Sequence, residues 1–112
     1  MIYDFVAKIK MVQNKEALDE TALLGLVDNV NGDFDTKLEH VRFVLADAEK
    51  TGELLVRSKI SISSMPNLHD KELESGVGAF LAYLEAVAKS VDGEISRQDG
   101  FYNNNTTFKK LF

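Results

Sequence analysis

The chain has 112 residues, of which 45% are hydrophobic and 28% charged, and its formal net charge is −5. This length and composition predict one globular domain, which can bury a core without metal or disulfide cross-links. The negative charge disfavours general nucleic-acid binding, because it repels phosphate backbones. The absence of cysteine excludes disulfides, thiolate nucleophiles and cysteine-ligated metal sites.

The N-terminal segment indicates a cytoplasmic protein without a membrane partner. Residues 1–13 mix charged with apolar side chains, and no apolar run approaches the length of a signal-peptide core or a membrane span. The lack of cysteine also fits a reducing compartment.

The first two predicted elements are a strand and a helix. Apolar side chains alternate with polar ones across Ile2–Gln13, which predicts a strand with one buried face. Asn14 is a suitable N-cap for a following helix whose first turns are acidic. We expect this helix to stop near Asn29, with Asn31 and Gly32 providing a left-handed exit.

Residues 36–50 fit two descriptions. One is a helix that ends at Gly52, and the other is a strand in which Val41, Phe43 and Leu45 alternate. The next segment, Leu54–Ser63, alternates clearly and is predicted to be a strand. We favour a hairpin, with Gly52 at a positive-φ position of its turn.

The longest helix is expected after Pro66. Its apolar side chains recur every three or four residues: Leu73, Val77, Phe80, Leu84, Val87 and Val91. Asn67 or His69 is expected to cap its start, and Gly93 to end it. The periodicity is then lost, and Gln98–Gly100 is predicted to form a turn.

Together these elements predict an α+β fold, in which an antiparallel sheet of about three strands packs against two helices in the order β-α-β-β-α. The domain is expected to span residues 1–100. Residues 101–112 are expected to form a flexible C-terminal tail.

No motif predicts a catalytic, cofactor-binding or metal-binding site. The polar segment around Gly32 resembles a calcium loop, but in both registers unsuitable residues fall at essential positions. Gly76 and Gly78 lie inside a predicted helix, whereas a phosphate-binding loop lies between a strand and a helix. His40 and His69 have no metal-ligand spacing.

Gly76, Ala79 and Tyr83 predict a close-packing surface on the long helix. Together with Ala86 they form a flank of small residues around one aromatic ring. Glycine inside a helix costs about 1 kcal/mol relative to alanine, so close approach of another backbone is the expected compensation. That backbone belongs either to the domain's own sheet or to a second copy of the helix.

The last eight residues carry the most specific binding signal. Phe108, Leu111 and Phe112 have the i, i+3, i+4 spacing of one helical turn, and Asn105 supplies an amide three residues earlier. This spacing resembles the sliding-clamp-binding peptides of replication proteins, which implies a short helical plug for an apolar pocket. The alternative is that these apolar residues fold back onto the core.

The sequence therefore favours a non-enzymatic accessory protein that binds another protein or forms a homo-oligomer. The C-terminal residues, the flank of small residues and the acidic segment Glu16–Asp35 are the expected contact surfaces. The alternative is a small-molecule-binding or enzymatic oligomer with a pocket between the sheet and the long helix. Its candidate polar groups are Arg57, Lys59, His40, Tyr83 and Tyr102.

Overall fold

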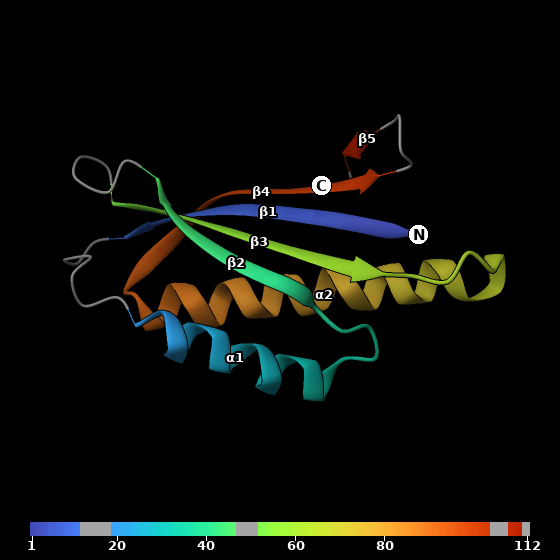
Figure 1. Cartoon of the computed structure of the whole chain (residues 1–112), viewed down its shortest axis with the longest axis horizontal. Helices are drawn as coiled ribbons and strands as arrows, with labels where there is room; N and C mark the ends of the chain where they lie inside the picture. Colours follow the sequence, from blue (N-terminus) through green and yellow to red (C-terminus); the bar gives the residue numbers. More distant parts are fainter. Residues whose placement is uncertain (12–18, 47–51, 104–107, 111–112) are drawn as a thin grey trace.

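The computed structural model describes residues 1–11, 19–46, 52–103 and 108–110, which form one sheet with two helices against one of its faces (Figure 1). The elements follow in the order β1 (Ile2–Met11), α1 (Glu20–Asp33), β2 (Glu39–Ala46), β3 (Glu53–Ser61), α2 (Pro66–Ser90), β4 (Gly93–Asn103) and β5 (Phe108–Lys110). Both helices lie on the same side of the sheet in Figure 1, so no described helix covers the opposite face.

The sheet has the strand order β2-β3-β1-β4-β5, and every neighbouring pair is antiparallel. Because β3 lies between β1 and β2, and β1 lies between β3 and β4, the two β-α-β units interleave in a split β-α-β arrangement. The predicted α+β class, the antiparallel sheet and the two packed helices are confirmed. The hairpin is confirmed as well, since β2 pairs with β3 and Gly52 has a φ of 64°.

The sheet has more strands than the three or so predicted, because the segment after the long helix is itself a strand. β4 spans Gly93–Asn103 beside β1, so the predicted turn at Gln98–Gly100 is wrong. The pairing shifts between Lys8 and Ile9, which leaves Ser96 as an extra residue in β4. This bulge interrupts the alternation of inward and outward side chains along β4, so the sequence of this segment lacks a clear alternation of apolar and polar residues.

Helix α1 begins and ends later than predicted. The Asp19 carboxylate accepts a hydrogen bond from the Ala22 amide at 3.2 Å, so Asp19 is the cap and the predicted cap at Asn14 is wrong. Asn14 itself lies outside the described residues. The helix continues past Asn29 and ends at Asp33.

The predicted left-handed exit from α1 is also wrong. Gly32 lies within the helix, and among the described residues the glycine with a positive φ is Gly52. The Asn31 side chain instead holds the segment after the helix, because its oxygen accepts from the Leu38 amide at 2.8 Å. Its nitrogen donates to the Leu38 carbonyl at 3.2 Å. Asn31 therefore fixes where β2 starts.

Helix α2 spans Pro66–Ser90 and has Met65 as its cap residue, without a side-chain capping bond. Proline is suited to the first turn because it lacks the amide hydrogen that would have no partner there. Neither Asn67 nor His69 caps the helix as predicted; His69 Nε2 instead lies 2.7 Å from the Tyr3 hydroxyl. The glycine expected at the end of α2 begins β4.

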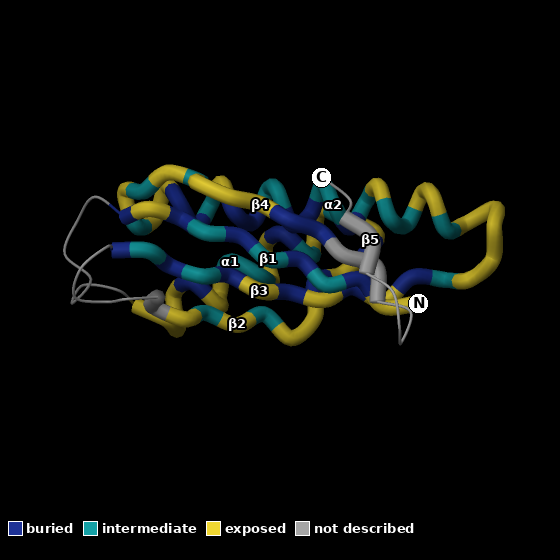
Figure 2. The backbone as a smooth tube through the Cα atoms, turned by 90° about the horizontal axis from the view of Figure 1, so that it is seen from above, coloured by how far each residue is buried: buried dark blue, intermediate teal, exposed yellow. Residues whose placement is uncertain are grey.

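The core lies between the two helices and the inner face of the sheet, and buried positions follow β1 and α2 in Figure 2. Phe5 and Phe80 stack with their ring centroids 4.9 Å apart, which joins β1 to α2. Tyr83 is fully buried and donates its hydroxyl to the Leu23 carbonyl at 2.7 Å, which joins α2 to α1. Helix α2 is therefore fixed to the sheet, and helix α1 is fixed to α2.

Replacing Tyr83 with phenylalanine is expected to lower the free energy of unfolding by about 1 kcal/mol, since one buried hydrogen bond is lost. Burial also raises the pKa of the Tyr83 hydroxyl. A raised folded-state pKa gives stability that is present below the unfolded value of about 10 and is lost as the pH rises above it. Urea unfolding at neutral and alkaline pH should show a smaller alkaline loss in Tyr83→Phe than in wild type. Equal losses would argue against this hydroxyl as the buried group.

Candidate functional site

The open face of the sheet, which no described helix covers, is the candidate functional surface. Tyr3, Phe5 and Ala7 of β1 are buried beneath the helices, so the alternate positions of β1 and the residues paired with them form the open face. Among the residues whose side chains the structure describes, it carries six basic ones: Lys8, Lys10, Arg42, Arg57, Lys59 and Arg97. Which of these charges are compensated decides what the surface can bind.

Four of the six basic side chains have acidic neighbours. The ion pairs are Lys8–Glu53 at 4.0 Å, Lys59–Asp4 at 3.9 Å and Arg97–Asp99. Lys10 lies opposite Glu53 on β3 and opposite Glu94 on β4. Arg42 and Arg57, by contrast, form no ion pair with any described residue and have no carboxylate directly opposite them in the strand pairing. Among the side chains that the structure describes on this face, these two arginines are the basic groups without a carboxylate partner.

Arg57 has only basic and apolar nearest neighbours on this face. Arg42 lies directly opposite it on β2, and Val6 lies directly opposite it on β1. Leu55 and Lys59 flank it along β3, at the adjacent positions of the same face. Like charges placed directly opposite each other destabilise an antiparallel pair. The arrangement is therefore electrostatically unfavourable.

A β-bulge in β2 places the two arginines directly opposite each other in the strand pairing. Glu39 pairs with Lys59 and Arg42 pairs with Arg57, so two residues of β2 lie opposite one residue of β3. The first of the two, His40, has a φ of 51°, in the left-handed region that glycine more often occupies at such bulges.

The bulge decides which face Arg42 occupies. Without it, Val41 would lie opposite Arg57, and Arg42 would point toward the helices, because a one-residue slip moves every side chain to the other face. The bulge also directs Phe43 into the core, where its ring centroid lies 6.2 Å from that of Tyr83. The extra residue in β2 therefore places Phe43 in the core and Arg42 on the open face.

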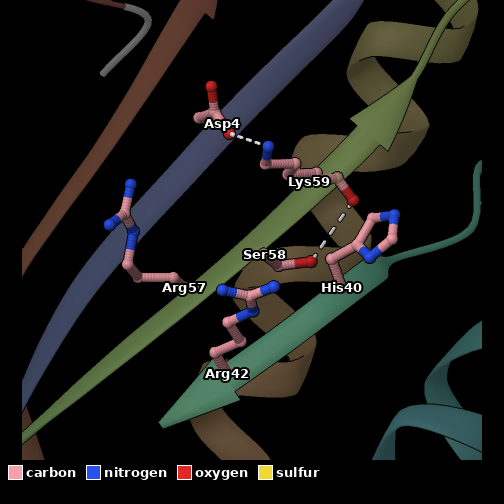
Figure 3. Close-up of a pocket in the computed structure, with 6 residues that line it drawn as sticks. All are labelled: Asp4, His40, Arg42, Arg57, Ser58 and Lys59. Carbon is pink, nitrogen blue, oxygen red and sulfur yellow. Dashed lines mark hydrogen bonds and ion pairs between the residues drawn. The ribbon is translucent and has the colours of Figure 1, made fainter. Parts of the chain in front are cut away.

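Ser58 supports the bulge from the core side. Its side chain is 2% exposed and occupies the inward row of β3 with Val56 and Ile60. The hydroxyl lies 3.2 Å from the Glu39 carbonyl oxygen and 3.3 Å from that of Lys59, the second contact being drawn in Figure 3. A polar residue in this apolar row is thus explained by the interrupted strand pairing beside it.

A cleft of about 340 Å³ opens beside the paired arginines (Figure 3). Its lining residues are Asp4, His40, Arg42, Arg57, Ser58 and Lys59. They come from three adjacent strands, β1, β2 and β3. The volume is near the lower end of the range for small-ligand sites, about 300–1,000 Å³. The cleft can therefore hold a small charged group together with part of the molecule that carries it.

Three of the polar residues predicted for a ligand pocket meet in this cleft: His40, Arg57 and Lys59. The cleft lies on the open face, whereas the predicted pocket was placed between the sheet and the long helix, where Phe5 and Phe80 stack. Tyr83 lies in that core. The side chain of Tyr102 lies outside the described part of the chain.

Sequence reasoning missed Asp4, Arg42 and Ser58. Asp4 and Arg42 are polar residues at outward positions of their strands, as expected. Ser58 is a polar residue at an inward position, where the neighbouring inward residues are apolar. An inward serine in an alternating strand is a signal for a bulge in the neighbouring strand, since its hydroxyl can bind a displaced carbonyl. That signal could have indicated the irregular pairing at His40.

The flank of small residues on α2 packs within the domain's own core. A Cβ added at Gly76 would lie 2.3 Å from Ile60 Cδ1 and 3.1 Å from Thr36 Cγ2. Ala79 and Tyr83 are both 0% exposed. The close approach at Gly76 therefore comes from side chains of the domain itself, one on β3 and one between α1 and β2.

The predicted C-terminal binding residues are described only in part. Phe108 lies in β5 and pairs with Asn103 of β4, so the chain has a strand there and not the helical turn that the resemblance implies. Asn105, Leu111 and Phe112 lie outside the described residues. β4 also continues across the predicted boundary between domain and tail.

Comparisons with protein-family models, with curated proteins and with solved structures give no match to this chain. Within the described ranges, no helix combines the length and the apolar character needed to cross a membrane. The same part of the chain holds no group of three or more His, Cys, Asp or Glu side chains placed to bind a metal ion. The cationic cleft is therefore the feature on which a function can be proposed.

Proposed function

We propose that the chain is a non-enzymatic accessory protein that binds an acidic segment of a partner protein through the open face of its sheet. The observation that carries the proposal is the Arg42–Arg57 pair, two cationic groups directly opposite each other without an ion-pair partner among the described residues. Carboxylates of an acidic segment supply the missing counter-charge, and arginine binds them through two parallel hydrogen bonds.

A protein partner suits this surface better than a nucleic acid. Sheets that bind single-stranded RNA stack bases on exposed aromatic side chains, whereas the described apolar side chains beside the arginines are aliphatic. They are Val6, Val44 and Leu55. The formal net charge of −5 further disfavours general binding of a nucleic-acid backbone.

The aliphatic side chains and the sheet edge give the partner further contacts. Val44 is 52% exposed and lies opposite Leu55 on the open face. Arginine combined with apolar contacts is typical of the centre of protein interfaces. β2 is also the edge strand of the sheet, so its outer backbone groups can pair with an extended segment. A partner segment that alternates acidic and apolar residues fits both features.

A labelled peptide of alternating glutamate and alanine, compared with its lysine–alanine counterpart, tests this proposal by fluorescence anisotropy at low ionic strength. The acidic peptide is expected to bind wild type, and to bind Arg42→Gln/Arg57→Gln at least about tenfold more weakly. Lys8→Gln/Lys10→Gln is the matched control, because it removes two charges of the same face that have acidic neighbours. Equal binding of both peptides, or an unaffected double arginine variant, would refute the proposal.

The same surface allows the partner to be a second copy of the chain. The exposed carboxylates of α1 could then meet the open face of another molecule, in a heterologous contact. Light scattering of the purified protein decides this. A mass above the monomer that falls at high salt, and in Arg42→Gln/Arg57→Gln, assigns the partner to a second copy. A monomeric mass throughout assigns it to a different protein.

A further inference from the structure

We propose that the cleft beside Arg42 and Arg57 is a binding site for a phosphate monoester. This inference rests on the proposed function, because it names the chemical group that the same arginine pair recognises on the open face. The phosphoryl dianion is carried either by a small phosphorylated molecule or by a phosphorylated side chain of the partner. Both sources present the same charge and the same three oxygens to the cleft.

The charge of the cleft matches a dianion. Arg42, Arg57 and Lys59 each contribute one positive charge and Asp4 one negative charge, so the lining groups sum to +2 with His40 neutral. A carboxylate would neutralise only half of this charge. A phosphate monoester carries about −1.5 to −2 at neutral pH and so neutralises nearly all of it.

The strand geometry allows both arginines to reach one phosphoryl group. Residues directly opposite each other in an antiparallel pair have Cβ atoms about 4.5–5.5 Å apart. Arg42 and Arg57 are such a pair, and each guanidinium presents a planar fork of donors that matches two phosphate oxygens. Lys59, at the next outward position of β3, adds an ammonium donor on the same side of the cleft. In Figure 3 the Arg57 guanidinium extends toward β1 and away from that of Arg42, so binding one phosphoryl group with both requires the Arg57 side chain to turn.

Asp4 is the residue of the cleft whose negative charge is expected to weaken phosphate binding. Its carboxylate lies 3.9 Å from Lys59 Nζ, a long contact, and its side chain is 14% exposed. This carboxylate competes with a bound phosphoryl group for Lys59 and repels the group directly. Neutralising Asp4 should therefore strengthen phosphate binding, although it changes a residue that lines the site.

Calorimetric titration of the full chain with phenyl phosphate tests the proposal, with benzoate as the monoanion on the same ring. We expect phenyl phosphate to bind at least about tenfold more tightly than benzoate. Its affinity should fall at least about tenfold in Arg42→Gln/Arg57→Gln, and rise about threefold or more in Asp4→Asn. Lys8→Gln/Lys10→Gln changes the net charge equally and should leave the affinity within about twofold.

Circular dichroism confirms that each variant is folded before titration. If Arg42→Gln/Arg57→Gln does not fold, Lys59→Gln and Asp4→Asn replace it, because they are expected to move the affinity in opposite directions. The proposal is overturned by an unchanged affinity in the arginine variant, by benzoate binding as tightly as phenyl phosphate, or by weaker binding in Asp4→Asn.

Free phosphoserine and a phosphoserine peptide distinguish the two sources of the phosphoryl group. A peptide that binds at least about tenfold more tightly than the free amino acid assigns the site to a phosphorylated partner. Equal affinities assign it to a small phosphorylated molecule. Failure of this inference is distinct from failure of the proposed function. Binding of the glutamate peptide without phenyl phosphate retains the function and removes the phosphate site, and the reverse result retains the site alone.

Discussion

Replacing Phe80 with alanine is expected to lower the free energy of unfolding by about 3–5 kcal/mol. Phe80 is fully buried and stacks on Phe5 with ring centroids 4.9 Å apart, so the substitution leaves a cavity between α2 and β1. The walls of that cavity belong to a helix and a central strand, which can close it only in part. This contact fixes the helices to the inner face of the sheet and so determines which face stays open.

The matched control on the same helix is Leu68→Ala. Leu68 is 40% exposed, and its loss is expected to change the free energy of unfolding by no more than about 0.5 kcal/mol. Urea denaturation measures both variants, and an unchanged m-value shows that the unfolded state is comparable. A loss below about 1 kcal/mol for Phe80→Ala would mean that α2 does not pack on β1 as described.

Replacing Arg57 with glutamate is expected to raise the free energy of unfolding by about 1 kcal/mol and to abolish anion binding. The new carboxylate would lie directly opposite Arg42 and beside Lys59, so a repulsive pair becomes attractive. A substitution that raises stability but removes binding is expected where two like charges lie opposite each other and a ligand supplies the opposite charge. Chemical denaturation measures the first effect, and titration with phenyl phosphate the second.

Lys10→Glu is the control with the same change in net charge. Lys10 lies opposite Glu53 and Glu94, so its replacement places three carboxylates side by side across the sheet. The free energy of unfolding should fall by about 1 kcal/mol, and both effects should shrink as salt screens the exposed charges. Stability changes of the same sign in Arg57→Glu and Lys10→Glu would show that net charge, and not local pairing, governs this face.

Most of the fold is predictable from the sequence because burial on one face leaves a periodic pattern. The alternation in β1 and β3, and the helical stripe that contains Phe80, are each sufficient to predict their element and its buried side. β4 is not predictable in this way. Ser96 is an extra residue in its pairing with β1, and Asp99 is polar but only 3% exposed, so the alternation is lost.

The candidate site is less predictable than the fold, because it depends on strand pairing. In the sequence, Arg42 and Arg57 are ordinary outward-facing residues of two strands, and nothing local specifies that they lie opposite each other. Their pairing follows from the bulge at His40, and the bulge is consistent with the inward packing of Phe43 near Tyr83. The register of two strands is set by tertiary packing and by turn geometry. The secondary-structure propensities of single residues do not specify either one.

If an anion binds between Arg42 and Arg57, the coupling free energy between the two side chains should change when the anion is added. A double-mutant cycle over wild type, Arg42→Gln, Arg57→Gln and the double variant measures the coupling between the two side chains in unfolding experiments. We predict a repulsive coupling of about 0.5 kcal/mol in buffer alone, which becomes attractive when phenyl phosphate is present. A coupling of zero under both conditions would contradict the assignment of Arg42 and Arg57 as one anion-binding pair.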